Sequence, residues 1–214
     1  MLTIVILCLI GITVAQQPRP CVSPSQWEGR VFVNNEKAQE SMRGKISYDA
    51  IYRRIRVIED IELSDDEFVY DVLTLYDSGL QFIYDLKSHS CIRKQITTPW
   101  TDYAIPSGAQ SYGEAYIGSS ALPDTGVLIT IWGGNITIPT FNYTISYIST
   151  WTFQGCFPVS RTFFDEKFGN EITSFYDITA GISDPNVFIP RRECLTAREY
   201  SMRQVLFGAP KKKN

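Results

Sequence analysis

The chain has 214 residues, a formal net charge of −3 and a single histidine, His89. Nucleic-acid-binding proteins of this size are normally basic, so the charge argues against that class. A serine hydrolase would need an acid and a positioned serine beside His89, and the sequence has no G-x-S-x-G motif. We therefore expect a protein that is not an enzyme.

The first fifteen residues predict a secretory leader. The segment 2–12 is apolar but too short to span ~30 Å of hydrocarbon, and small residues lead up to a predicted cleavage after Ala15. No later apolar run is long enough for a transmembrane anchor. We expect one domain over 16–208, large enough to bury roughly 70% of its unfolded surface, and a disordered basic tail over 209–214.

Four cysteines remain after the leader: Cys21, Cys91, Cys156 and Cys194. An even number in a secreted chain is typical of a disulfide framework, and four cysteines allow three pairings that the spacing alone does not decide. Asn135 and Asn142 each begin an N-x-T sequon, which predicts N-glycosylation. Both features indicate a location outside the cytosol.

Alternating apolar and polar residues predict a mostly β chain. Strands are expected at 27–33, 44–48, 51–58, 68–76, 80–86, 91–97, 126–132, 141–153, 157–164 and 172–178, with a hairpin turn at Asp77-Ser78-Gly79. Nine or ten strands in one domain predict antiparallel sheets, arranged as a sandwich or a partly open barrel. Thr196 and Glu199 have the spacing of a capping box, which predicts a C-terminal helix over 197–207.

The strand at 141–153 also predicts which of its faces is inside. A glycan on Asn142 must point to solvent, so the alternate positions, which are mostly aromatic, should point inward. Such a row either fills an ordinary core or lines a cavity that holds an apolar ligand, and periodicity does not separate the two. For the second case, we expect the cavity to be lined by Trp27, Phe82, Tyr84, Trp100, Ile129, Ile131, Tyr143, Ile145, Tyr147, Trp151 and Phe153.

The sequence supports a metal site less well than it supports an apolar cavity. Zinc would lack ligands once the cysteines are oxidised. Calcium prefers oxygen ligands, and Asp65-Asp66-Glu67, Asp124 and Asp184 stand in loop-like contexts, but none has EF-hand spacing. Calcium binding is therefore kept as a possibility to which no residues are assigned, and we expect no other cofactor.

Several blocks resemble the ependymin family in its vertebrate ependymin-related type. They are Pro20-Cys21, Gln26-Trp27-Glu28-Gly29-Arg30, Ser47-Tyr48-Asp49, Pro99-Trp100, Phe175-Tyr176-Asp177-Ile178 and Gly181-Ile182 followed by Asp184-Pro185, and they occur in order along the mature chain. The resemblance implies two antiparallel sheets curved around a hydrophobic pocket, similar to bacterial lipoprotein carriers, in a homodimer. It also implies pairing of Cys21 with Cys156 and of Cys91 with Cys194.

The same resemblance implies a secreted or lysosomal glycoprotein associated with calcium, with extracellular matrix and with anionic phospholipids and gangliosides. Our leading hypothesis is a carrier that holds amphiphilic lipids, including fatty acids, and binds anionic ones more tightly at acidic pH, where protonated carboxylates no longer repel them. The alternative is a calcium-dependent extracellular adhesion or signalling module with a filled core.

Overall fold

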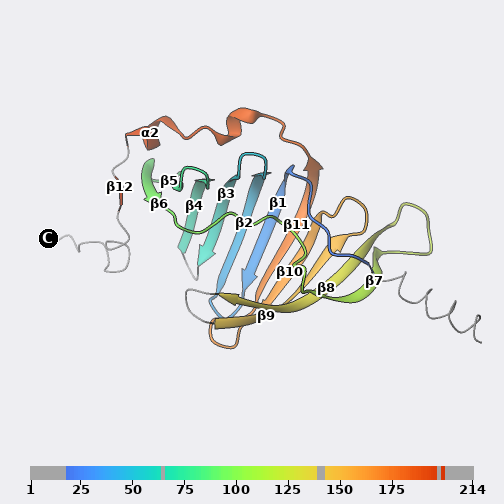
Figure 1. Ribbon diagram of the computed structural model, residues 1–214. Coiled ribbons are helices and arrows are strands. Elements are labelled where there is room, and N and C mark those ends of the chain that lie inside the picture. Colours follow the sequence, from blue (N-terminus) through green and yellow to red (C-terminus); the bar gives the residue numbers. More distant parts are fainter. Residues whose placement is uncertain (1–17, 64–65, 139–142, 197–198, 201–214) are drawn as a thin grey trace, which may run out of the picture. The chain divides into compact units, whose positions relative to one another are not determined.

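The computed structural model describes residues 18–63, 66–138, 143–196 and 199–200 (Figure 1). The prediction of a mostly β, antiparallel fold is confirmed. The described residues divide into two compact units: residues 18–23 with 103–165 form the first unit, and residues 24–102 with 166–200 form the second. The predicted leader and basic tail lie outside the described residues.

The first unit is built on four consecutive antiparallel strands. They are β7 (Gln110–Gly118), β8 (Gly126–Ile138), β9 (Tyr143–Thr152) and β10 (Pro158–Phe164). Trp132 and Trp151 pack with Ile105 and Cys156 in its core. The disulfide between Cys21 and Cys156 fixes the start of the unit to the loop between β9 and β10.

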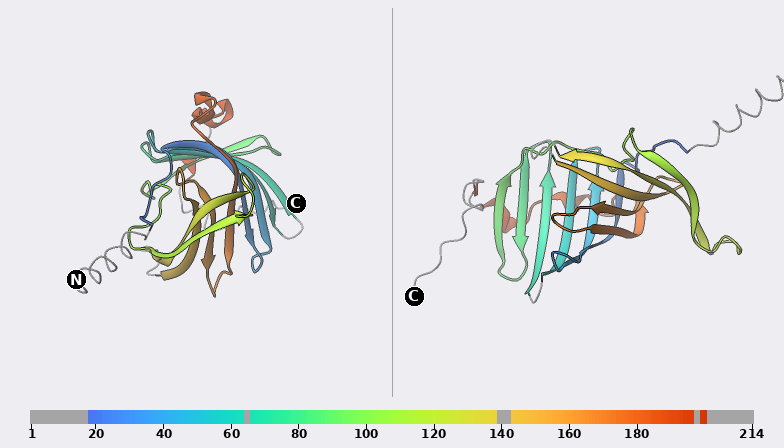
Figure 2. Two further views of the ribbon diagram at one scale, coloured as in Figure 1. Left: turned by 90° about the vertical axis from the view of Figure 1, so that its right-hand side faces the viewer. Right: turned by 90° about the horizontal axis from the view of Figure 1, so that it is seen from below.

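The second unit is a sheet in the order β12-β6-β5-β4-β3-β2-β1-β11, antiparallel except for the β12–β6 pair. Its strands are β1 (Gln26–Asn35), β2 (Glu40–Asp49), β3 (Arg54–Leu63), β4 (Asp66–Leu75), β5 (Leu80–Asp85), β6 (Ser90–Gln95), β11 (Glu171–Ala180) and β12 (Glu199–Tyr200). After β11 come the 3-10 helix η2 (Pro185–Phe188) and the helix α2 (Arg192–Leu195). Figure 2 shows this orange-red segment on one side of the sheet.

The turn between β4 and β5 forms as the sequence predicts. Gly79 adopts a φ of 64°, which a residue without Cβ tolerates, and its N–H donates to the carbonyl of Tyr76 at 3.1 Å. Each of the ten predicted ranges overlaps a strand of the structure. The range 51–58 began too early, because residues 50–53 form the turn and β3 starts at Arg54.

Two elements differ from the prediction. Strand β7 was missed, and its register shifts between Ser111 and Gly113, so a bulge interrupts the alternation that would have indicated a strand. A short helix lies before the predicted range, at Arg192–Leu195, and Glu199–Tyr200, which were predicted as helix, extend the sheet beside β6. The rest of the predicted helix, at 197–198 and 201–207, lies outside the described residues.

Candidate functional site

The sheet of the second unit has two different faces. One face carries Leu73, Phe82 and Tyr84, which pack against Phe188 and Cys194 of the C-terminal segment. We call it the covered face. Residues that pair directly across neighbouring strands share a face, so the strand register identifies which side chains belong to the opposite face of the sheet.

The other face carries an apolar row that crosses five strands. Ile46, Val57, Val72, Ile83 and Ile92 stand directly opposite one another on β2, β3, β4, β5 and β6. Ile46 is 4% exposed, the middle three are half-buried, and Ile92 is 39% exposed. We call these residues the apolar row and this side of the sheet the apolar face.

An aromatic stack lies on the apolar face next to the row. Trp27 and Tyr48, both almost fully buried, stack with ring centroids 5.2 Å apart, and Trp100 stacks on Tyr48 at 5.3 Å. The indole N–H of Trp100 donates to Asp102 at 2.7 Å. The structure thus brings Trp27 and Trp100 together, as two of the predicted cavity residues.

The apolar face carries several carboxyl groups, among them Glu59 and Asp85. Glu59 follows Val57 by two positions and pairs with Gly44 on β2 and Tyr70 on β4. Burial raises the pKa of Glu59, and the charge of Glu40 raises it further. The face therefore contains a group that becomes neutral at a higher pH than an ordinary carboxyl.

The first unit has an aromatic face of its own. Tyr147, Ser149 and Trp151 of β9 are buried and Tyr143 and Ile145 are half-buried, whereas the alternate residues Thr144, Ser146 and Ile148 are exposed. The polar atoms of this face are partly satisfied within it, because the Trp151 indole donates to the Ser149 hydroxyl at 3.0 Å. We call it the aromatic face.

Several predicted cavity residues lie elsewhere. Phe82 and Tyr84 are on the covered face of the second unit, opposite to the side of Trp27. Ile129 and Ile131 pair with Thr152 and Thr150, so they are on the reverse side of the sheet from Tyr147.

Phe153, another of the predicted cavity residues, does not join the aromatic face either. It lies beyond the end of β9 and is 49% exposed. It contributes instead to a surface depression of about 510 Å³ in the first unit, together with Tyr116, Val127 and Phe157. The alternation that placed Phe153 inside ends where the strand ends, because the chain turns at residues 153–156.

Sequence reasoning missed the apolar row. None of its five residues was among the predicted cavity residues, although alternating β-branched residues such as Ile55, Val57 and Ile61 on β3 carried the signal. The aromatic residues drew attention to the longest aromatic strand instead. In the structure, the residues that stand opposite one another in the apolar row are all β-branched.

A second cavity, of about 290 Å³, lies on the covered face and has charged side chains in its lining. Glu28, Lys45, Ser47, Arg56, Ser183 and Val187 contribute to its lining. Burial alone would raise the pKa of Glu28, but hydrogen bonds from Ser183 and Ser47 outweigh it, so the pKa is lowered. The carboxylate is therefore already satisfied by the protein.

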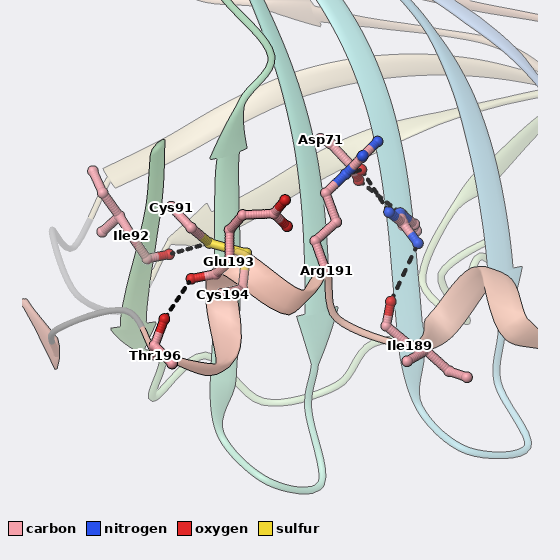
Figure 3. The surroundings of a disulfide bond; sticks show 9 residues. Asp71, Cys91, Ile92, Ile189, Arg191, Glu193, Cys194 and Thr196 are labelled. Atoms are coloured by element: carbon pink, nitrogen blue, oxygen red, sulfur yellow. Dashed lines mark hydrogen bonds and ion pairs between the residues drawn. A yellow bond between two sulfur atoms is a disulfide. The ribbon is translucent and has the colours of Figure 1, made fainter. Parts of the chain in front are cut away.

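Both disulfides have the pairing that the family resemblance implies. Cys21 bonds to Cys156 and Cys91 bonds to Cys194, which ties α2 to β6 (Figure 3). Asn135 is exposed on β8, whereas Asn142 lies outside the described residues. His89 lies in the turn before β6, and its ring is within 3.1 Å of the Tyr84 hydroxyl.

The candidate calcium residues that the structure describes do not gather into a site. Within the described ranges, no group of three or more His, Cys, Asp or Glu side chains could hold a metal ion. Asp184 caps η2 by accepting from Asn186, and Asp65 lies outside those ranges. Among the same residues, no helix combines the length and the apolar character needed to cross a membrane.

Comparison with known proteins gives three findings. The model of the family described as Ependymin matches residues 64–194. The chain is 28% identical to mammalian ependymin-related protein 1 of Rattus norvegicus, over 93% of this chain and 87% of that protein, and 27% identical to ependymin-2 of Carassius auratus, over 91% and 88%. An uncharacterized conserved protein from Thermus thermophilus shares the fold, with 10% identity, a TM-score of 0.50, and coverage of 80% of this chain and 88% of that one.

Proposed function

The chain belongs to the ependymin family, and we propose that it is a secreted and lysosomal glycoprotein that holds amphiphilic lipids without acting as an enzyme. The observation that carries this proposal is the apolar row. A sheet that faces water on one side normally alternates apolar and polar residues, with the apolar side covered. Here the row runs straight across five strands and becomes more exposed toward Ile92.

The energetics suit an acyl chain. Burying ten methylene groups against such a row contributes about 8 kcal/mol before the costs of association are subtracted. An apolar surface that buries about ten methylene groups is therefore nearly enough to hold a fatty acid or the acyl chain of a phospholipid. Anionic phospholipids, gangliosides and fatty acids are the ligand classes that the family resemblance suggests.

Acidic pH favours this binding in our proposal. Glu59 stands on the apolar face, and its raised pKa means that it loses its charge early as the pH falls. Neutral Glu59 makes the face more apolar and lessens its repulsion of anionic lipids. A homodimer, matrix attachment and calcium binding are suggested by the family resemblance alone.

The first experiment asks whether lipid is present. The protein is expressed in animal cells, purified without detergent, and the molecules released on denaturation are identified by mass spectrometry. A stoichiometric amphiphile is the expected result. Lipid-free protein that also takes up no fluorescent fatty acid would contradict the proposal and favour the adhesion module with a filled core.

The second experiment places the lipid on the apolar face. Ile92 is 39% exposed on that face, and Ile58 is 37% exposed on the covered face, where it pairs with Lys45 and Asp71. We expect Ile92→Lys to weaken uptake of a fluorescent fatty acid about tenfold, since a charge replaces buried apolar area. Ile58→Lys, matched in residue type and exposure, should leave uptake unchanged.

A further inference from the structure

Arg161 is isolated in the sequence. It is the only lysine, arginine or histidine between Lys94 and Lys167. It lies on β10 directly opposite Ser149 of β9, which places it on the aromatic face of the first unit. In the neighbouring row of that face, Phe163 stands opposite Tyr147.

Within the described ranges, the guanidinium group of Arg161 has no polar partner. Its carbon lies 4.6 Å from the centroid of the Phe163 ring, so the group stacks on an aromatic surface. Its Nε atom is buried and makes no hydrogen bond, and no carboxylate among the described residues forms an ion pair with it. Buried polar groups are nearly always paired, because an unpaired buried charge costs several kcal/mol.

Ser149 offers a second donor at the same place. It is 3% exposed, and its oxygen accepts from the Trp151 indole at 3.0 Å. The hydroxyl proton is therefore free to point elsewhere, and within the described part of the chain it has no acceptor. Directly opposed residues have Cβ atoms about 5 Å apart, so one anionic group can reach both side chains.

We propose that Arg161 and Ser149 form the headgroup site for an anionic amphiphile, whose carboxylate or phosphate binds the guanidinium while its apolar part lies along Phe163 and the aromatic face. The planar guanidinium group can donate two parallel hydrogen bonds to such an anion. Asp165, at the other end of this face, accepts from the Tyr143 hydroxyl at 3.0 Å. The inference rests on the proposed function, lipid binding, and assigns a headgroup site within the first unit.

The test compares two lipids that differ only in the headgroup. Oleoyl lysophosphatidate and monooleoylglycerol share their acyl chain and glycerol, and differ by one phosphate. At neutral pH, we expect the wild-type protein to prefer the phosphate lipid about tenfold or more, as hydrogen bonds to a charged group imply. Arg161→Gln should abolish this preference and leave the affinity for monooleoylglycerol within about twofold.

Two further variants sharpen the result. Arg30→Gln removes the same charge from an exposed arginine that pairs with Asp177 at 3.3 Å, and it should leave the preference intact. Arg161→Lys keeps the charge but loses the two parallel donors, so it should retain only part of the preference. The melting temperature of lipid-free Arg161→Gln should stay close to that of the wild type, because the lost stacking on Phe163 is offset by removal of a buried Nε that makes no hydrogen bond. A large fall in melting temperature would mean that Arg161 is paired within the protein, which overturns the proposal.

The remaining outcomes separate this site from the proposed function. If Arg161→Gln weakens both lipids equally, or leaves the preference unchanged, the headgroup site is wrong while lipid binding stands. If neither lipid binds the wild-type protein, both proposals fall. If inorganic phosphate displaces lysophosphatidate completely at the same concentration, the site binds free phosphate and the assignment to a lipid headgroup is wrong. Failure of phosphate to compete supports the lipid.

Discussion

The Nε atom of Arg191 lies 2.6 Å from a carboxylate oxygen of Asp71, although 120 residues separate them in the sequence (Figure 3). Arg56 binds the same carboxylate from the neighbouring strand. Asp71 is only 3% exposed, so two guanidinium groups compensate a buried charge. Arg56 also donates to the carbonyl of Val187 at 2.5 Å, which holds the C-terminal segment on the covered face.

Removal of this carboxylate should be strongly destabilising. We expect Asp71→Asn to lower the free energy of unfolding by about 3–5 kcal/mol, because two arginines lose their partner in a buried place. Asp77→Asn removes a carboxylate from the exposed pair with Arg53, and should cost less than about 1 kcal/mol. Urea unfolding of the three proteins measures both values. Equal stability of the two variants would show that the Asp71 cluster contributes no more than a surface pair.

The disulfide between Cys91 and Cys194 holds the same segment. It joins residues 103 positions apart, and Cys194 is almost completely buried. In the chain-entropy model, a loop of that length contributes about 4–5 kcal/mol, so Cys91→Ala with Cys194→Ala should lower the free energy of unfolding by that amount. Urea unfolding under non-reducing conditions tests this. A loss below about 1 kcal/mol would mean that the Asp71 cluster and the core hold the segment unaided.

The sequence allowed the strands to be predicted because alternation and turn residues act locally. Asp77-Ser78-Gly79 marked the β4–β5 hairpin, and the glycine adopts the positive φ that such a turn needs. The predicted C-terminal helix fails at Glu199 and Tyr200, the part of it that the structure describes, because a capping-box spacing is only a local preference. In the structure, Glu199 and Tyr200 pair with β6 instead, a contact across about a hundred residues that no local pattern reports.

The candidate site was predicted less well, and the reason is geometric. Alternation divides a strand into two faces but does not say which face of one strand joins which face of the next. Phe82 and Ile83 show the difficulty, because Phe82 packs beneath the C-terminal segment while Ile83 joins the apolar row. On β9 the aromatic side chains fixed the face, and the exposed Thr144 and Ser146 agree with it. Arg161 was visible as the single basic residue of a long stretch, but only the strand register shows what it faces.

Glycosylation of Asn135 can be tested directly. Its side chain is exposed on β8 and accepts from the Ser146 hydroxyl at 2.9 Å, on the polar side of the strand pair. We expect the protein secreted from animal cells to carry a glycan there, so Asn135→Gln should reduce the mass by one glycan without changing the melting temperature. Thr144→Ala, which removes the sequon of Asn142, provides the comparison. An unchanged mass in Asn135→Gln would mean that this sequon is not used.

Glu59 predicts a pH dependence with a definite sign. Its pKa in the folded protein is raised above the ordinary value of 4.5, so its contribution to stability is greatest below that value and is lost as the pH rises through the raised pKa. Glu59→Gln should therefore raise the melting temperature at about pH 7 and have little effect at about pH 4. At about pH 7, Glu59→Gln should also take up more of a neutral lipid than the wild type. Glu62→Gln, which loses an exposed pair with Arg43 on the opposite side of β3, should show neither gain.

Adjacent positions on β5 should separate stability from lipid binding. Phe82 is 7% exposed within the core beneath the C-terminal segment, so Phe82→Ala should cost about 3–5 kcal/mol of unfolding free energy. Ile83 is half-buried in the apolar row, so Ile83→Ala should cost about 1–2 kcal/mol but weaken fatty-acid uptake several-fold. Urea unfolding and a fluorescent fatty-acid titration, both performed below the unfolding midpoint of the weaker variant, measure the two effects. If Phe82→Ala weakens uptake as much as Ile83→Ala, the lipid does not distinguish the two faces, and its assignment to the apolar row is wrong.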